Sequence, residues 1–428
     1  MKAEVGRPDP RPPGFQRLVY AGFCWMTRHP GAWRLLGSLL RHMTRFNLSV
    51  PIVARRDSVR KALTRTRSFS NTAHAPNLIA SDFMIGMDPG PTYEADRALF
   101  ESFLGMLSPG EHANLEAQKR ATDLARRGPG ADFDLIEDYL MWVVFAAIKP
   151  AFGLAADYVV AGSRDDVPDE AAQRHYLHEV RYVAAHLLAG RLAPVAVKRR
   201  AEVCAAALRA RIVKMTPELC LAWPQSSSTA YSAIQRNAIG LAWVSHPVTV
   251  QSGAQVIQEL LGRPKVYDAL RKMATELGPA AWTCGKFRQT MTGHVLELMR
   301  FRPVFPVLAR DVPRAAELDT GARNNLKCPA GSGLGVLGIS ALFDPHGMED
   351  INAYCPSRAW KSDEDVRFLM FGLGDRQCPA KQHAVEILTS ALIGMLTLPR
   401  LDWTDRWGSR IGYDGPLINR MRLRLACA

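Results

Sequence analysis

The order of apolar and polar residues along this chain predicts a mainly α-helical protein with small β-sheets. The expected helices span residues 57–64, 134–153, 292–301 and 384–393. The second of these is a long apolar helix that ends in a glycine, as a core helix does. The expected strands lie at 49–53 and within 326–339.

Length and composition fit one large soluble enzyme. The chain has 428 residues, and its hydrophobic share of 47% is ordinary for a globular core. No linker, repeat or low-complexity tract divides it. We therefore expect a single domain over residues 15–428, after a proline-rich start at 1–14 that is extended or disordered.

The cysteines and the apolar segments bear on the compartment. Eight cysteines are scattered along the chain without a CxxC pair, and no signal peptide precedes them. We therefore expect free thiols in a reducing cytoplasm. The sequence shows no run of about 18 apolar residues, so we expect no membrane-spanning helix.

The net charge of +13 is concentrated at the start of the chain. Residues 1–70 hold fourteen Lys or Arg against Glu4, Asp9 and Asp57, a difference of +11. A basic start suits an acidic electron-transfer protein of the ferredoxin type, a membrane surface or nucleic acid. Residues 26–43 have roughly helical spacing, and the simplest interpretation is the solvated face of an ordinary helix. No zinc spacing or RNA-binding aromatic motif supports nucleic-acid binding.

One cysteine follows a glycine-rich turn. Residues 371–378 read Phe-Gly-Leu-Gly-Asp-Arg-Gln-Cys, and an apolar helix follows them. Glycines let the backbone pass close to a flat porphyrin, while backbone N–H groups and the helix dipole favour a thiolate. Arg376 can pair with a haem propionate. This combination indicates haem ligation by Cys378, and a buried structural cysteine is the alternative.

This segment resembles the cysteine-ligand loop of the cytochrome P-450 superfamily. Other motifs of the family are matched in the same order from about residue 49 to the end of the chain. The matching segments are Ser68–Ser70, Asp88–Arg97, Glu297–Arg300, Pro329–Gly331, Asp344–Pro345 and Tyr354–Arg358. The resemblance implies a haem-thiolate oxidoreductase of the soluble bacterial type, with haem b as its cofactor.

The resemblance also implies which residues hold the haem. In the cysteine loop these are Phe371, Gly372, Arg376 and the iron ligand Cys378. Arg97 keeps the family's place for a propionate partner. Tyr93, four residues earlier on the same helical face, stands where histidine is usual and can still donate to a propionate.

Two further sets of charged residues match the family. Arg310 is expected to bind a propionate from a strand, although it lies one residue further from Arg300 than the family pattern has it. Glu297 and Arg300 share one helical face and, with Arg358, are expected to form a buried structural triad beneath the cysteine loop.

The chain departs from the family where protons are usually delivered. The helix above the haem normally carries an acid and a threonine, which supply protons for dioxygen activation. Here Pro247 takes the place of the acid and Val248 that of the alcohol; if the alignment shifts by one residue, Thr249 becomes the alcohol. Proline in this helix also frees the carbonyl of Trp243 and bends the axis.

His246 has two interpretations. An imidazole above the haem could assist peroxide cleavage, because its pKa lies near neutrality. Fatty-acid peroxygenases of the superfamily carry a basic residue followed by proline at this place, and His246-Pro247 is similar to that pair. Alternatively, His246 faces a neighbouring helix and is hydrogen-bonded there.

The sequence therefore favours a monooxygenase acting on a mostly apolar small molecule. A peroxygenase, or an oxygen-independent haem-thiolate dehydratase or isomerase, is the second hypothesis, because the acid–alcohol pair is missing. A haem-binding sensor is the third, but an apolar pocket favours substrate binding. The candidate lining residues are Phe83, Met84, Trp243, Val244, Val304, Phe305 and Val307.

Overall fold

The computed structural model describes residues 13–42, 51–77, 83–163, 169–224, 231–319, 325–346, 350–358, 366–404 and 411–426. The α-helices are α1 (Pro13–Arg28), α2 (Pro30–His42), α3 (Arg56–Thr64), α4 (Pro91–Gly105), α5 (Pro109–Arg126), α6 (Met141–Ile148), α7 (Ala156–Ala161), α8 (Glu170–Ala189), α9 (Val195–Lys214), α10 (Thr216–Ala222), α11 (Tyr231–Gly240), α12 (His246–Leu261), α13 (Pro264–Leu277), α14 (Gly285–Phe301), α15 (Gly338–Leu342) and α16 (Lys381–Thr397). The strands are β1 (Ile52–Val53), β2 (Asp132–Asp134), β3 (Leu308–Asp311), β4 (Ala316–Leu318), β5 (Leu326–Cys328), β6 (Gly333–Val336), β7 (Leu401–Trp403), β8 (Ile411–Asp414) and β9 (Leu417–Leu425).

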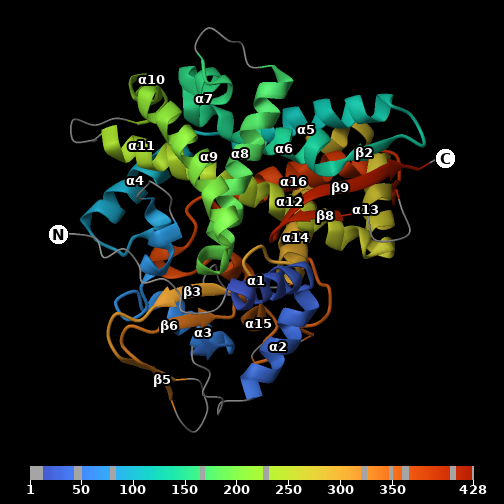
Figure 1. Ribbon diagram of the computed structural model, residues 1–428. Coiled ribbons are helices and arrows are strands. Elements are labelled where there is room, and N and C mark those ends of the chain that lie inside the picture. The colour runs from blue at the N-terminus through green and yellow to red at the C-terminus, as the bar shows by residue number, and fades with distance from the viewer. Residues whose placement is uncertain are drawn as a thin grey trace.

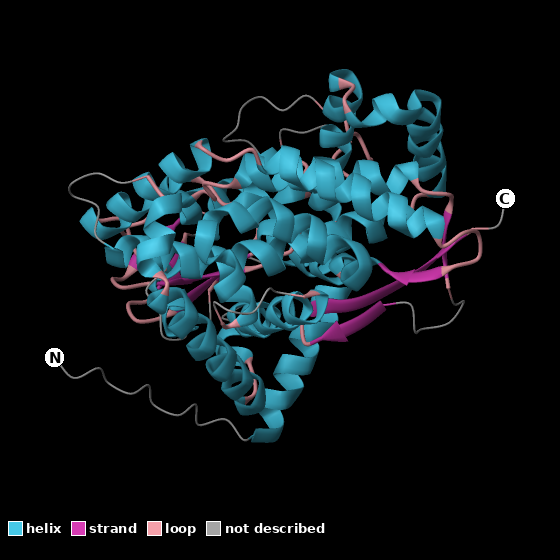
Figure 2. Ribbon diagram, turned by 90° about the horizontal axis from the view of Figure 1, so that it is seen from above, coloured by secondary structure: helices cyan, strands magenta, loops and turns pink. Residues whose placement is uncertain are grey.

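Helices make up most of the molecule, as the sequence predicts. In Figure 1 the helices α4 to α11 lie in the upper part, whereas α1, α2, α3 and α15 lie below them beside β3 and β6. Figure 2 shows the strands in separate places at opposite sides of the helical mass. The prediction of a mainly α-helical fold with small sheets is confirmed.

The sheets are short. In one, β6 lies between β1, to which it is parallel, and β3, to which it is antiparallel. In another, β9 pairs antiparallel with β2, β7 and β8. The hairpin β4–β5 forms a third. Residues 326–339, expected to be strand-like throughout, divide between two sheets at the Pro329–Gly331 turn, where Gly331 has a φ of +75°.

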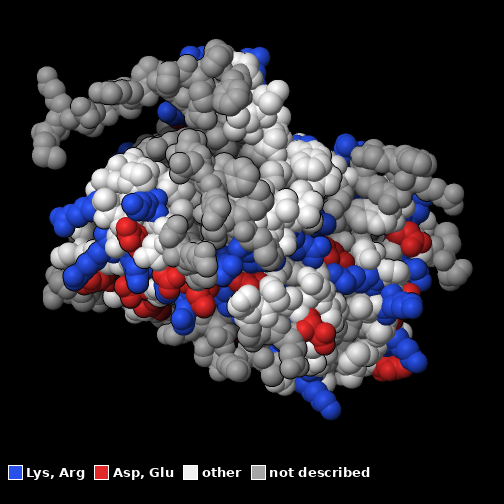
Figure 3. Space-filling model, turned by 90° about the horizontal axis from the view of Figure 1, so that it is seen from below, with Lys and Arg blue, Asp and Glu red and all other residues white. Residues whose placement is uncertain are grey.

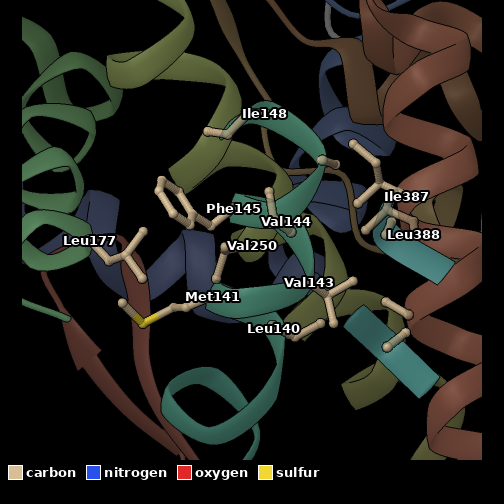
Figure 4. Close-up of a cluster of buried hydrophobic side chains, with 14 of the residues drawn as sticks. Leu140, Met141, Val143, Val144, Phe145, Ile148, Leu177, Val250, Ile387 and Leu388 are labelled. Atoms are coloured by element: carbon tan, nitrogen blue, oxygen red, sulfur yellow. The ribbon is translucent and has the colours of Figure 1, made fainter. Parts of the chain in front are cut away.

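The core is built around α6. Its side chains face α8 at Leu177, α12 at Val250 and α16 at Ile387 and Leu388, as Figure 4 shows. Nearly every residue of α6 is buried, which explains why this helix is apolar on all sides.

The helical run that contains α6 bears on the expectation that no helix spans a membrane. Residues Leu135–Ala161 form a run that is long and apolar enough to cross a membrane by length and composition, although no such segment was expected. Within the protein, 67% of its most apolar window is buried, as in a core helix. The run changes from a π-helical turn at Leu135–Leu140 to α6, and then to a 3₁₀ segment at Lys149–Ala155 that is kinked at Gly153.

Other boundaries agree closely with the pattern. α3 begins one residue before the expected helix, and α14 ends at Phe301 as expected but begins seven residues earlier. α16 extends the expected helix at both ends. Of the strand expected at 49–53, residues 49 and 50 lie outside the described residues, as do 1–12 of the expected extended start; α1 already begins at Pro13.

Candidate functional site

The loop before α16 is shaped by two glycines. Gly372 and Gly374 have φ values of +79° and +65°, in the left-handed region that favours glycine. A Cβ at Gly372 would lie 3.2 Å from the carbonyl oxygen of Arg376. The Cys378 N–H donates to the carbonyl of Phe371 at 2.8 Å, so the loop closes back on its own start. This closure holds Cys378 in the loop directly before α16.

The environment of the Cys378 thiol is mixed. Burial raises its pKa, whereas the N–H of Ala380 and the charges of Arg97 and Lys381 act in the opposite direction. Within the described residues, no three His, Cys, Asp or Glu side chains are grouped so as to hold a metal ion.

Two residues of α4 bind the backbone of the cysteine loop. Tyr93 Oη donates to the carbonyl of Asp375 at 2.6 Å. Arg97 Nη1 donates to the same carbonyl at 2.5 Å and to the carbonyl of Gln377 at 3.1 Å. The two side chains also contact each other, at 3.1 Å. The structure thus brings Tyr93 and Arg97 to the Cys378 loop from one helical face.

A second cluster lies where the loop meets β3. Arg376 forms an ion pair with Asp88 and donates to the carbonyl of Phe69 at 3.4 Å. Arg310 is only 5% exposed. Burial and, after it, the nearby charge of Arg376 lower the pKa of Arg310 to about 10, whereas the carboxylate of Asp88 acts in the opposite direction. Among the described residues, the Nε atoms of both arginines are buried without a hydrogen-bond partner.

His74 joins this cluster, although the sequence analysis did not select it. Burial and, after it, the charges of Arg310 and Arg376 lower its pKa to about 4, although a hydrogen bond to the backbone of Ala309 acts in the opposite direction. No spacing pattern links a histidine at position 74 to arginines more than 200 residues away. The two buried guanidinium groups share the carboxylate of Asp88, while the exposed Asp375 acts only on Arg376. Haem propionates would add the negative charge that such a buried pair lacks.

The expected buried triad is confirmed. Glu297 and Arg300 form a bidentate pair at 2.7 and 2.9 Å, with side chains 2% and 0% exposed. Arg300 also donates to the carbonyls of Leu342, Ile351 and Ala353. Arg358 Nη2 lies 3.8 Å from the Glu297 carboxylate. The pair ties α14 to the segment that leads toward the cysteine loop.

The helix that carries His246 is interrupted. Between α11 and α12, residues Leu241–Ser245 form a π-helical turn, which the missing N–H of Pro247 helps to explain. The break predicted at Trp243 is therefore present. Directly before it, Gly240 lies against Phe83, and a Cβ there would lie 2.1 Å from the phenyl ring.

The side chain of His246 lies against α6. Its Nε2 is 3.1 Å from the carbonyl oxygen of Met141, and its ring meets that of Phe145 edge-on at 6.4 Å. The residue is 1% exposed, and burial lowers its pKa to about 4. This is the second of the two positions considered from sequence. Thr249, three residues later on α12, is buried at 8% exposure.

Four of the seven candidate pocket-lining residues belong to the main hydrophobic core or its edge. Phe83, Met84 and Trp243 are buried in the main hydrophobic cluster, where Val244 packs at its edge. One contact that sequence reasoning missed joins α4 to α11: Asp96, 1% exposed, accepts two hydrogen bonds of 2.8 Å from Arg236. No local sequence pattern predicts that Asp96 and Arg236 form this pair.

Comparisons with known proteins support the resemblance. No family model matches the sequence. Cytochrome P450 81D1 of Arabidopsis thaliana is 35% identical over 98 residues, which cover 23% of this chain and only 19% of that protein.

Solved structures match over far more of the chain. The crystal structure of CalO2 matches with a TM-score of 0.66 and 16% identity, over 99% of each chain. The open cytochrome P450 Eryk from S. erythraea matches with a TM-score of 0.67 and 18% identity, over 94% of this chain and 97% of its own. CYP109B1 from Bacillus subtilis matches with a TM-score of 0.66 and 17% identity, over 91% of this chain and 98% of its own. At such identities the likeness establishes the fold.

Proposed function

The chain has the cytochrome P-450 fold, and we propose that it is a haem-thiolate monooxygenase that oxidises a mostly apolar small organic molecule. The observation that carries this proposal is the loop around Cys378. Two left-handed glycines shape it, Tyr93 and Arg97 bind its carbonyls, and a buried arginine pair lies beside it.

The residues of this chain divide the work of holding haem b. Cys378 would be the thiolate ligand, and Phe371 and Gly372 would form the loop wall beside the ring. Arg310 and Arg376 would bind the propionates, with His74 as an additional neighbour of that cluster. Arg97 would assist through its charge, which opposes the rise in the pKa of the Cys378 thiol that burial causes. When bound, the haem supplies a redox-active iron for transfer of an oxygen atom to the substrate.

We assign His246 to helix positioning and the proton-delivery role to Thr249. The imidazole is bonded to α6, and with a pKa of about 4 it is neutral at pH 7, so it has no acidic imidazolium proton to deliver there. The hydroxyl of Thr249 is the remaining candidate from the sequence, and it follows the π-helical turn on the same helix. Water bound at that turn would complete the proton path, since no acid stands beside Thr249 in the sequence.

A peroxygenase is the second candidate function. Pro247 and Val248 occupy the places of the usual acid–alcohol pair, and supplied peroxide needs fewer protons than dioxygen does. The two candidates share the same haem site and differ only in the source of the oxidant.

If dioxygen is the oxidant, the electron donor would be a separate acidic protein of the ferredoxin type. The basic excess near the start of the chain supports this. Figure 3 shows a face on which Lys and Arg side chains interleave with Asp and Glu, rather than gathering in one basic patch. Attraction to an acidic partner on such a face would be short in range and weakened by salt.

Haem ligation is tested by a carbon monoxide spectrum. The reduced protein with carbon monoxide should show the red-shifted Soret band of haem-thiolate proteins, and Cys378→Ala should abolish it. Cys204→Ala, which removes another half-buried cysteine on α9, should leave the band unchanged. A band that survives in Cys378→Ala would overturn the proposal.

A further inference from the structure

A separate cavity lies between α1, α2 and the ends of α12 and α14. Its volume is about 430 Å³, within the range of small-molecule sites. Its lining contains none of the residues assigned to the haem. Figure 1 shows α1 next to α14, and Arg302 at the end of α14 donates to the carbonyl of Arg28 at 3.3 Å. The lining residues are Trp25, Arg28, His29, Pro30, Gly31, Ala32, Arg34, Glu259, Phe301 and Arg302.

Positive charge around this cavity exceeds negative charge. Glu259 accepts ion pairs from Arg263 at 2.8 Å and from Arg302 at 3.4 Å, so its single carboxylate is already shared. Arg28 and Arg34 stand in the lining as two more cations. Four arginines against one glutamate leave an excess of three positive charges.

Among the described residues, Arg28 in the lining and Arg263 beside it each have a buried Nε without a hydrogen-bond partner. Arg34 lies over the ring of Phe343, with its guanidinium carbon 4.7 Å from the ring centroid. Burial lowers the pKa of Arg34, and the charges of Arg263 and Arg302 also lower it, whereas the carboxylate of Glu259 raises it. Arg28 donates one hydrogen bond to the carbonyl of Gly415, but its Nε has no hydrogen-bond partner among the described residues. An oxyanion would satisfy such donors and reduce the repulsion.

An aromatic surface adjoins these cations. Trp25 is 54% exposed and stacks on His29, with ring centroids 4.5 Å apart. A large exposed indole beside arginines offers a flat apolar face next to an anion-binding edge.

We propose that this cavity binds a small organic anion, with its carboxylate or phosphate held by Arg28 and Arg34 and its flat apolar part packed on Trp25. Glu259 then has a positioning role, because it fixes Arg263 and Arg302 behind the ligand. The proposal does not depend on haem binding or on the reaction at Cys378.

The test is calorimetric titration of the full-length protein with phenyl phosphate, benzoate and inorganic phosphate. Phenyl phosphate and benzoate should bind saturably, and binding should weaken with salt. Arg34→Gln should weaken both by at least about tenfold, the usual value of one charge-assisted hydrogen bond. Trp25→Ala should weaken phenyl phosphate but leave inorganic phosphate unchanged. Arg17→Gln, on the exposed side of α1, is the matched control and should change nothing.

Three results would overturn the proposal. One is the absence of saturable binding by either aromatic anion. Another is equal affinity in Arg34→Gln and in the Arg17→Gln control. The third comes from vesicles of phosphatidylcholine and phosphatidic acid: Arg34-dependent binding to vesicles, without binding of phenyl phosphate, would assign the cations to a lipid headgroup instead.

Discussion

Arg376 and Asp88, 288 residues apart in the sequence, form an ion pair in which the arginine side chain is 3% exposed. Arg310 lies beside this pair and carries a second buried positive charge. Asp88 is thus the carboxylate that the two guanidinium groups share, with the exposed Asp375 as a weaker neighbour of Arg376, and a haem propionate would neutralise buried positive charge at this place.

Asp88→Asn should lower the stability of the cofactor-free protein more than that of the haem-loaded protein. Without haem, the change leaves both arginines charged and without the carboxylate that they share, which should lower the free energy of unfolding by about 1–3 kcal/mol. With haem bound, the loss should be smaller, because the propionates supply negative charge at the same place. Urea unfolding of both forms measures the difference. Asp57→Asn, which changes an exposed carboxylate on α3, serves as the control. An equal loss in both forms of Asp88→Asn would contradict the assignment.

Much of this site could be predicted from the sequence because its parts are local. Gly372, Gly374 and Cys378 lie within one short loop, and their geometry follows from the left-handed φ that only glycine adopts readily. Glu297 and Arg300 share a helical face at a spacing of three. Such features need no knowledge of the tertiary fold.

The rest depends on segments that meet only after folding. His74 reaches Arg310 because β3 and the segment before α4 pack together. The direction of His246 was open from sequence, since a helix position alone does not say which neighbour it faces; the packing of α12 against α6 determines it. The division of residues 326–339 between two sheets likewise follows from strand pairing.

Glu297→Ala should be strongly destabilising. It leaves Arg300, a fully buried guanidinium, without its carboxylate partner. The expected cost is about 3–5 kcal/mol, and we expect poor haem incorporation to accompany it. Chemical denaturation and the ratio of haem to protein measure the two effects. Asp123→Ala, which breaks the exposed pair with Arg126, should cost less than about 1 kcal/mol. Normal haem content and stability in Glu297→Ala would show that the triad has no structural role.

His246 should make stability depend on pH in the acidic range. The folded protein protonates this histidine only near pH 4, whereas an unfolded chain does so near 6.5. Between these values the unfolded chain binds more protons, so stability is complete above about pH 6.5 and falls as the pH drops toward 4. The loss from this group should approach about 3 kcal/mol.

His246→Gln should remove that contribution. Because His74 and His294 also have pKa values lowered to about 4, the informative quantity is the difference between wild type and variant at each pH. This difference should shrink as the pH falls from 6.5 to 4. A difference that is constant with pH would show that the imidazole is not buried as described.

The source of the oxidant can be determined with two variants on one helix. If His246 only positions α12, His246→Gln should keep turnover per haem with hydrogen peroxide within about threefold of wild type, well short of the 10²–10⁴-fold that a placed acid–base group contributes. Thr249→Ala should lower the product formed per electron in a surrogate ferredoxin system, because the hydroxyl no longer helps to deliver protons, and should affect peroxide-driven turnover much less. Product formation and peroxide release, measured at equal haem content, separate these effects. A loss of 10²-fold or more in His246→Gln with peroxide, at unchanged haem content, would restore the acid–base role of the imidazole and favour the peroxygenase.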